Sequence, residues 1–104
     1  GRTCLARWNG IGLAVQVGST GADPCEAATA TARWARLAGP TWRTQRGLAV
    51  GDAAARMRGL YPRARLRGGR WWLVSGRQAG RAVPRLRAEV RSGRVAALWV
   101  DVRR

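Results

Sequence analysis

Arg63–Ser75 reads RARLRGGRWWLVS, and this stretch decides the expected fold. Its first half alternates arginine with apolar residues, its second half is aromatic and aliphatic, and Gly68-Gly69 separates the halves. A period of two around a two-residue glycine turn is typical of a β-hairpin. A second unit of this kind runs from Arg85 to Arg91, turns at Ser92-Gly93 and returns as Arg94–Val102. The C-terminal third is therefore predicted to form two hairpins of an antiparallel sheet.

Two-residue turns also predict which side chains lie opposite one another and which share a face. One face is expected to be apolar, with the pairs Leu66/Trp71, Ala64/Leu73, Leu86/Trp99, Ala88/Ala97 and Val90/Val95. The other face is expected to carry Arg65/Trp72, Arg63/Val74, Arg67/Arg70, Arg87/Leu98, Arg85/Val100 and Glu89/Ala96. This second face mixes guanidinium groups with large apolar side chains, whereas a face that only contacts water usually carries Thr, Ser, Lys and Glu.

The mixed face is the candidate binding site, because Arg and Trp are enriched among the residues that dominate protein interfaces. Its candidate partner-binding residues are Arg63, Arg65, Trp72, Arg85, Arg87 and Leu98. The alternative is that the N-terminal strand or the loop Gly76–Pro84 folds over this face. Trp72 would then be an ordinary core residue.

Helix signals occur in the first two thirds of the chain, after a β-prone stretch at Ile11–Val17. Asp23-Pro24-Cys25-Glu26 has the pattern of a helix start, and the expected helix runs through Leu37 to Gly39-Pro40. A second helix is expected after the cap residue Asp52 and ends before Pro62. The sequence thus predicts one α+β domain over residues 1–104, with two helices packed on one face of an antiparallel sheet of about four strands.

The charge is strongly unbalanced. All 20 basic residues are arginine, there are five acidic residues, and the net charge is +15. Codon usage in a GC-rich genome is one explanation for the arginine, but it does not explain the scarcity of acids. Such a charge attracts anions, so candidate partners are an acidic protein, a cell-envelope component, nucleic acid or an anionic wall polymer.

Composition also restricts the chemistry. Without His and Lys, the chain cannot build a Ser-His or Ser-Lys site, a Schiff base, a His-containing metal site or a P-loop. The acids Asp23, Glu26 and Asp52 are assigned to helix caps, and Glu89 to an ion pair. Asp101 then has no carboxylate to pair with. We therefore expect no enzyme activity, no metal and no small-molecule cofactor.

Cys4 and Cys25 form an even pair without the CxxC spacing of a metal or redox site. A disulfide between them is one interpretation, and it would add about 3 kcal/mol of stability and imply an oxidising compartment. Two buried free thiols are the other. The sequence has no apolar run long enough for a transmembrane helix. A secreted protein whose signal peptide was removed before Gly1 is expected, with a cytosolic protein as the alternative.

One pattern resembles a known family. It consists of Gly47–Asp52, the segment ending at Leu60-Tyr61-Pro62, Arg70–Val74 and Gly93–Val100. It is similar to the repeat unit of the BamE/SmpA outer-membrane assembly lipoproteins and of the β-lactamase-inhibitor protein (BLIP) domains. The resemblance covers Gly47–Val100. With Cys4 and Cys25-Glu26-Ala27-Ala28, the whole chain also resembles uncharacterised exported proteins of high-GC Gram-positive bacteria.

This resemblance implies protein–protein binding through an exposed sheet face or edge. Together with the mixed face, it predicts an exported, non-catalytic interaction module for a protein or envelope partner. The alternative is a polyanion-binding protein whose affinity would fall steeply as salt rises. We rank it second because the arginines are spread along the chain and no DNA-recognition motif is present.

Overall fold

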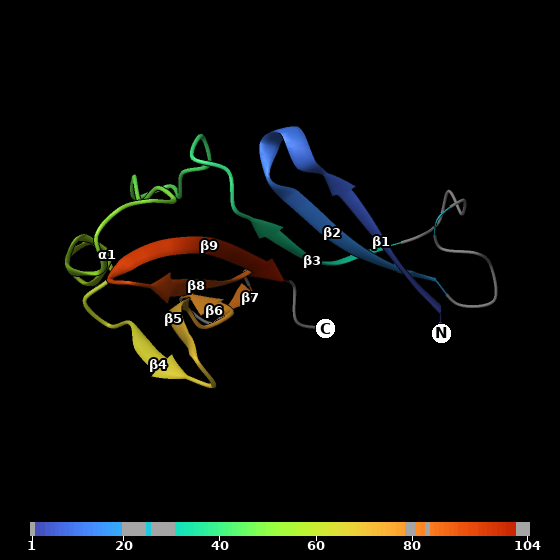
Figure 1. The fold of residues 1–104 in the computed structure, drawn as a ribbon. Coiled ribbons are helices and arrows are strands. Elements are labelled where there is room, and N and C mark those ends of the chain that lie inside the picture. Colours follow the sequence, from blue (N-terminus) through green and yellow to red (C-terminus); the bar gives the residue numbers. More distant parts are fainter. Residues whose placement is uncertain (1, 20–24, 26–30, 79–80, 83, 102–104) are drawn as a thin grey trace.

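The computed structural model describes residues 2–19, 25, 31–78, 81–82 and 84–101 (Figure 1). Their main feature is one antiparallel sheet of seven strands in the order β1-β2-β3-β9-β8-β5-β4. The strands are β1 (Arg2–Trp8), β2 (Leu13–Ser19), β3 (Thr31–Leu37), β4 (Arg65–Arg67), β5 (Arg70–Val74), β8 (Arg85–Arg91) and β9 (Arg94–Asp101). The hairpin β6 (Arg77–Gln78) and β7 (Arg81–Ala82) forms a separate small sheet. The described helical segments are a 3₁₀ turn, η1 (Asn9–Ile11), and the short helix α1 (Ala54–Leu60).

The prediction of two helices on a sheet of about four strands is wrong. Residues 31–37, expected to end the first helix, form β3 between β2 and β9. Trp34 and Leu37 were expected on one helical stripe, but they lie on opposite faces of the strand. The segment Thr31–Leu37 fits both the helical and the strand period, and its hydrogen-bonded pairing with β2 and β9 decides for the strand. The expected caps Asp23 and Glu26 lie outside the described residues.

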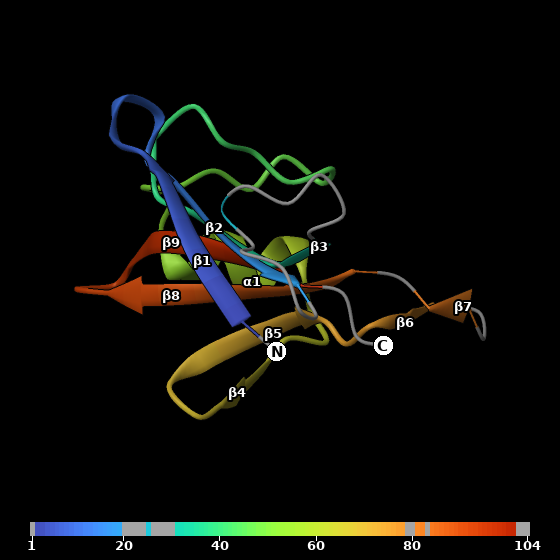
Figure 2. The ribbon, with the colours of Figure 1, turned by 90° about the vertical axis from the view of Figure 1, so that its right-hand side faces the viewer.

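The sheet consists of two antiparallel halves that meet at β3 and β9. The first half is β1-β2-β3 and the second is β4-β5-β8-β9. The pairs Ala35/Val100 and Arg36/Trp99 belong to the junction. Figures 1 and 2 show that the sheet is strongly twisted, since β1 runs at a steep angle to β8. The junction brings residues of the first third of the chain beside the C-terminal hairpin.

The register of the first hairpin is confirmed, with the pairs Arg65/Trp72, Leu66/Trp71 and Arg67/Arg70. The second hairpin differs from the prediction beyond its turn. Val90 pairs with Val95 as expected, but the register then shifts between Glu89 and Val90. The pairs that follow are Glu89/Ala97, Ala88/Leu98, Arg87/Trp99, Leu86/Val100 and Arg85/Asp101. A bulge inserts one residue into a strand, so every later side chain changes face.

The second expected helix is present as α1, and it covers the apolar face of the C-terminal half-sheet. Met57 of α1 is fully buried, and Tyr61, the residue that follows the helix, is 4% exposed. These two side chains belong to one core cluster with Leu48, Leu73, Ala88, Val95 and Leu98. The apolar face of the sheet is therefore the inner face around α1.

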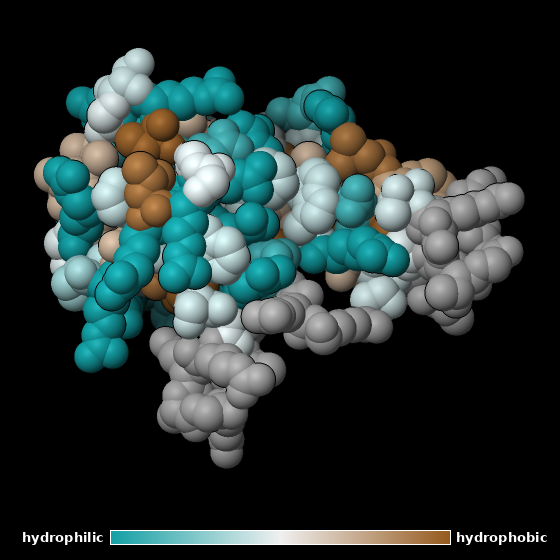
Figure 3. All heavy atoms as spheres, turned by 90° about the horizontal axis from the view of Figure 1, so that it is seen from below, coloured by the Kyte–Doolittle hydropathy of each residue, from teal (hydrophilic) through white to brown (hydrophobic). Residues whose placement is uncertain are grey.

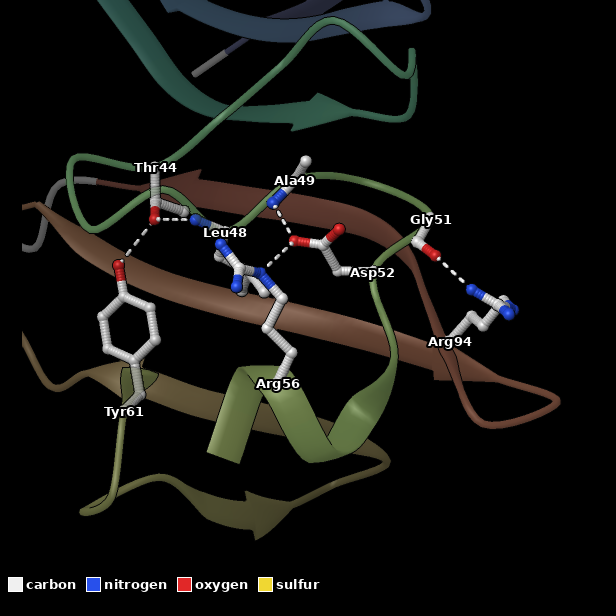
Figure 4. Close-up of polar contacts among 8 residues, drawn as sticks. All are labelled: Thr44, Leu48, Ala49, Gly51, Asp52, Arg56, Tyr61 and Arg94. Atoms are coloured by element: carbon white, nitrogen blue, oxygen red, sulfur yellow. Dashed lines mark hydrogen bonds and ion pairs between the residues drawn. The ribbon is translucent and has the colours of Figure 1, made fainter. Parts of the chain in front are cut away.

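Asp52 does not cap α1, whose N-cap is Ala53 without a side-chain hydrogen bond. Instead the Asp52 carboxylate accepts hydrogen bonds from the Ala49 N–H at 2.8 Å and from Arg56 Nε at 3.2 Å (Figure 4). The Ala49 N–H lowers the pKa of Asp52. Asp52 thus holds the turn before the helix in place.

The segment between β3 and α1 is anchored along its length. The Tyr61 hydroxyl donates to Thr44 Oγ1 at 2.8 Å, and the same oxygen accepts from the Leu48 N–H at 3.1 Å (Figure 4). Trp42 Nε1 donates to the Ile11 carbonyl at 2.6 Å. These contacts fix residues 42–48 over the apolar face.

Cys4 of β1 and Cys25 form a disulfide with a Cα–Cα distance of 5.4 Å, which confirms the expected pairing. Among the residues described, no helix is long and apolar enough to span a membrane.

Candidate functional site: the Arg/Trp row

The sheet pairings place arginine and tryptophan alternately across five strands on the face opposite α1. The cross-strand neighbours are, in order, Arg36 on β3, Trp99 on β9, Arg87 on β8, Trp72 on β5 and Arg65 on β4. We call these five residues the Arg/Trp row. Arg65 is exposed to solvent, and the other four are half-buried. Figure 3 shows the side on which β4 lies in Figure 1, where hydrophilic side chains surround separate hydrophobic patches.

The guanidinium groups of this face stack on its indole rings. Arg70 Cζ lies 3.8 Å from the centroid of the Trp99 ring, and Arg36 Cζ lies 5.9 Å from it. Arg87 and Arg85 approach the Trp72 ring at 5.4 and 5.5 Å. Cation–π contacts contribute about 0.5–2 kcal/mol each, with more when they are shielded from water. Each indole of the row therefore has two guanidinium groups close to its ring.

Trp99 also has an aromatic neighbour. The Trp34 ring on β3 lies with its centroid 4.8 Å from that of Trp99, tilted by 49°. Tilted ring pairs at this distance are favourable beyond the area they bury. Trp34 on β3 thereby adds a further indole next to Trp99.

Glu89 is the acid that organises the β3 end of the row. Its two carboxylate oxygens accept hydrogen bonds from Arg36 Nε at 3.1 Å and Arg36 Nη2 at 3.2 Å. Trp99 Nε1 donates to the same carboxylate at 2.5 Å. The hydrogen bond from Arg36 lowers the pKa of Glu89, and the bond from Trp99 acts in the same direction. Glu89 is thus ionised at neutral pH and fixes both neighbours in place.

Asp101 on β9 is the second carboxylate of this face, and it pairs with Arg85 and Arg87. Arg85 Nη2 donates to its Oδ2, and Arg87 Nη2 lies 3.6 Å from its Oδ1, too far for a hydrogen bond. The Nε atoms of Arg85 and Arg87 and Oδ1 of Asp101 are buried without a hydrogen-bond partner among the described residues. Burial lowers the pKa of Arg87, and the Asp101 charge opposes that shift.

The two carboxylates leave the face positively charged. Five arginines lie on it within the row or stacked on its rings, namely Arg36, Arg65, Arg70, Arg85 and Arg87. Glu89 pairs with Arg36, and Asp101 pairs with Arg85 and Arg87. The two negative charges offset two of the five positive charges, so this group of side chains has a net charge of +3. The face is therefore ready to accept anionic groups.

Of the six residues predicted for partner binding, the structure brings Arg65, Trp72, Arg85 and Arg87 together on this face. Arg63 precedes β4 and is exposed close to them. Leu98 is different, because it is 2% exposed and belongs to the core cluster. The bulge in β9 moves Leu98 to the inner face and puts Trp99 into its expected place.

Sequence reasoning missed Arg36, Trp34 and Trp99 as members of this face. It placed Arg70 on the face, opposite Arg67, but not among the candidate binding residues. Trp99 was placed on the apolar face because the bulge was not foreseen. Arg36 and Trp34 were assigned to a helix, although the alternation Trp34–Ala35–Arg36–Leu37 also has the period of a strand. That alternation was the available signal for including β3.

A groove of about 540 Å³ lies at the β4 end of the row. It is lined by Arg46, Tyr61, Pro62, Arg63, Arg65, Arg67, Trp72, Leu73, Val74 and Ser75. Among the described residues, the lining combines four arginines with two aromatic rings and includes no acid. Such a groove can take a flexible anionic chain.

Comparison with known proteins gives no relative from which a role could be transferred. The chain matches no protein-family model, no curated protein sequence and no solved structure. Within the described part of the chain, no group of three or more Cys, Asp or Glu side chains could hold a metal ion.

Proposed function

We propose that this chain is an exported, non-catalytic interaction module that binds an acidic segment of a partner protein through the Arg/Trp row. The observation that carries the proposal is the unbroken alternation of guanidinium and indole groups across five strands. Carboxylates of a partner can pair with the arginines, and its apolar side chains can lie on the indoles between them.

The site is also partly preorganised for binding. Glu89 fixes Arg36, and Asp101 pairs with Arg85 and Arg87, so these long side chains are already ordered before a partner arrives. Ordering a flexible side chain at an interface costs about 0.5–1.5 kcal/mol. Part of that cost is met within the free protein, which favours binding.

Export is supported by the disulfide between Cys4 and Cys25, because disulfides persist in oxidising compartments. The partner class that fits this environment is an acidic secreted or cell-envelope protein.

A second candidate function is the binding of a polyanion such as nucleic acid or an anionic wall polymer. It is favoured by the groove beside β4, which Arg63, Arg65 and Arg67 line together with the rings of Tyr61 and Trp72. Single-stranded nucleic acids are bound by this combination of a basic groove and stacking aromatics.

Charge reversal on the exposed part of the site tests the proposal. Arg63→Glu/Arg65→Glu removes two exposed cations next to Trp72 without breaking a described ion pair. The matched control Arg7→Glu/Arg58→Glu makes the same change in net charge at exposed positions outside the row and its groove. Binding of a fluorescent peptide that alternates Glu with Leu, and of oligodeoxythymidine, is measured by anisotropy over a range of salt concentrations.

We expect the peptide to bind the native protein. Its affinity should fall about tenfold or more in Arg63→Glu/Arg65→Glu and should stay almost unchanged in the control variant. Equal losses in both double variants would show attraction by net charge alone and refute the site. Tighter binding of oligodeoxythymidine, with a steep dependence on salt, would favour the polyanion function instead.

A further inference from the structure

A second hollow lies on the opposite, apolar side of the sheet and is separate from the Arg/Trp row. It has a volume of about 470 Å³ and lies between the segment 42–46 and the strands β3, β5, β8 and β9. Its lining residues are Leu37, Trp42, Arg43, Thr44, Gln45, Arg46, Tyr61, Val74, Pro84, Arg85, Leu86, Leu98 and Val100. We call this hollow the apolar pocket.

The floor of the apolar pocket is aliphatic. Leu98 in the floor is buried in the core, whereas Leu37, Val74, Leu86 and Val100 are only half-buried. These side chains lie on one face because their strands pair side by side. Covering apolar surface of this kind with a ligand stabilises the complex by about 25 cal/mol for each Å² removed from water. The volume also lies within the range of ordinary small-molecule sites.

The rim of the pocket is cationic. The Arg46 guanidinium is held in place, since its Cζ lies 4.8 Å from the Tyr61 ring centroid and its Nη1 donates to the Leu60 carbonyl at 2.8 Å. Among the described residues, its remaining N–H groups have no hydrogen-bond partner. Arg43 lines the pocket as well, and none of the described lining residues is an acid. Arg85 contributes less charge here, because its guanidinium is paired with Asp101 on the other face.

From this arrangement we infer a binding site for a small anionic amphiphile, an alkyl carboxylate whose chain lies on Leu86 and Val100 and whose carboxylate pairs with Arg46 and Arg43. An aliphatic floor next to a fixed, exposed guanidinium is complementary to both halves of such a molecule. None of these four residues belongs to the Arg/Trp row, so the inference does not rest on the proposed function, although Arg46 also lines the groove at the β4 end of the row.

Titration calorimetry with decanoate and decanol, below the concentration at which decanoate forms micelles, tests this site. The variants are Arg46→Gln, which removes the fixed guanidinium, and Val100→Phe, which fills the pocket with an apolar side chain. Arg7→Gln on β1 is the matched control, because it removes the same charge from an exposed position outside the pocket. Circular dichroism and thermal unfolding confirm that each variant is folded.

We expect decanoate to bind the native protein about tenfold more tightly than decanol, which is the value of one charge-assisted contact. Arg46→Gln is expected to remove that preference while weak binding of decanol persists, and Val100→Phe to abolish the binding of both. Equal binding of the two ligands would overturn the inference. So would an equal loss of decanoate affinity in Arg7→Gln and Arg46→Gln, or unchanged binding in a folded Val100→Phe variant. If Val100→Phe is unfolded, the comparison of Arg46→Gln with Arg7→Gln decides alone.

Discussion

Glu89→Gln tests whether one carboxylate organises the Arg/Trp row. The Glu89 side chain is 14% exposed, and it accepts two hydrogen bonds from Arg36 and one from Trp99. Glutamine has almost the same shape, but it offers one oxygen instead of two and turns an NH₂ group toward the Arg36 guanidinium. The change therefore removes a charge and one hydrogen bond while leaving the packing almost unaltered.

The magnitude follows from the exposure of the two partners. A hydrogen bond to a charged group is worth about 1.5–3 kcal/mol when it is buried. Arg36 is 33% exposed, so water replaces part of the lost interaction and the lower half of that range applies. We expect Glu89→Gln to lower the free energy of unfolding by about 2 kcal/mol. The control Arg91→Gln removes an ion pair whose arginine is 78% exposed, and it should cost less than about 0.5 kcal/mol.

The assay is urea unfolding at neutral and acidic pH with the disulfide intact. A loss of 2 kcal/mol corresponds to a midpoint about 1 M lower in urea. Because folding lowers the pKa of Glu89, its contribution is complete above its ordinary value of 4.5 and is lost as the pH falls through the lowered value. The difference between native protein and variant should therefore shrink in acid. A midpoint unchanged at neutral pH, or a difference that persists undiminished well below the lowered pKa, would refute the role of Glu89.

Three further predictions concern stability and use the same unfolding measurement. Ser92 has φ of 52° in the turn between β8 and β9, so Ser92→Asn should add about 0.5–1 kcal/mol, and a decrease would contradict the turn geometry. Gly39→Ala should cost about 2 kcal/mol or more, because a Cβ there would collide with the backbone of the β1–β2 turn. Its control Gly59→Ala, with nothing within 4 Å of the added Cβ, should instead stabilise α1 by about 0.5–1 kcal/mol, and equal effects of the two would refute the close approach. Cys4→Ser/Cys25→Ser should lower the free energy of unfolding by about 3 kcal/mol, and thiol titration of the unreduced native protein should detect no free thiol at these two positions.

The first hairpin was predictable because its signals are local. A two-residue glycine turn places Arg65 opposite Trp72 without help from the rest of the chain. The second helix was predictable for the same reason, since Met57 and Tyr61 have helical spacing and Pro62 follows them. Cysteine count and spacing left two interpretations, a disulfide or two free thiols, and the structure shows the disulfide between Cys4 and Cys25.

The bulge in β9 was not predictable from the turn. It moves Leu98 into the core and Trp99 onto the Arg/Trp row, and it therefore changes the candidate site at one position. An inserted residue leaves no mark in a run such as Val95-Ala96-Ala97, because small apolar residues fit either face.

The sequence by itself determined the excess of arginine, the absence of histidine and lysine, and the Arg65–Trp72 pair. Only the tertiary structure decided that residues 31–37 are a strand, because a segment that fits two periods takes the conformation that its neighbours pair with. That strand places Arg36 beside Trp99. The Arg65–Trp72 pair of the first hairpin thereby becomes one end of a row across five strands.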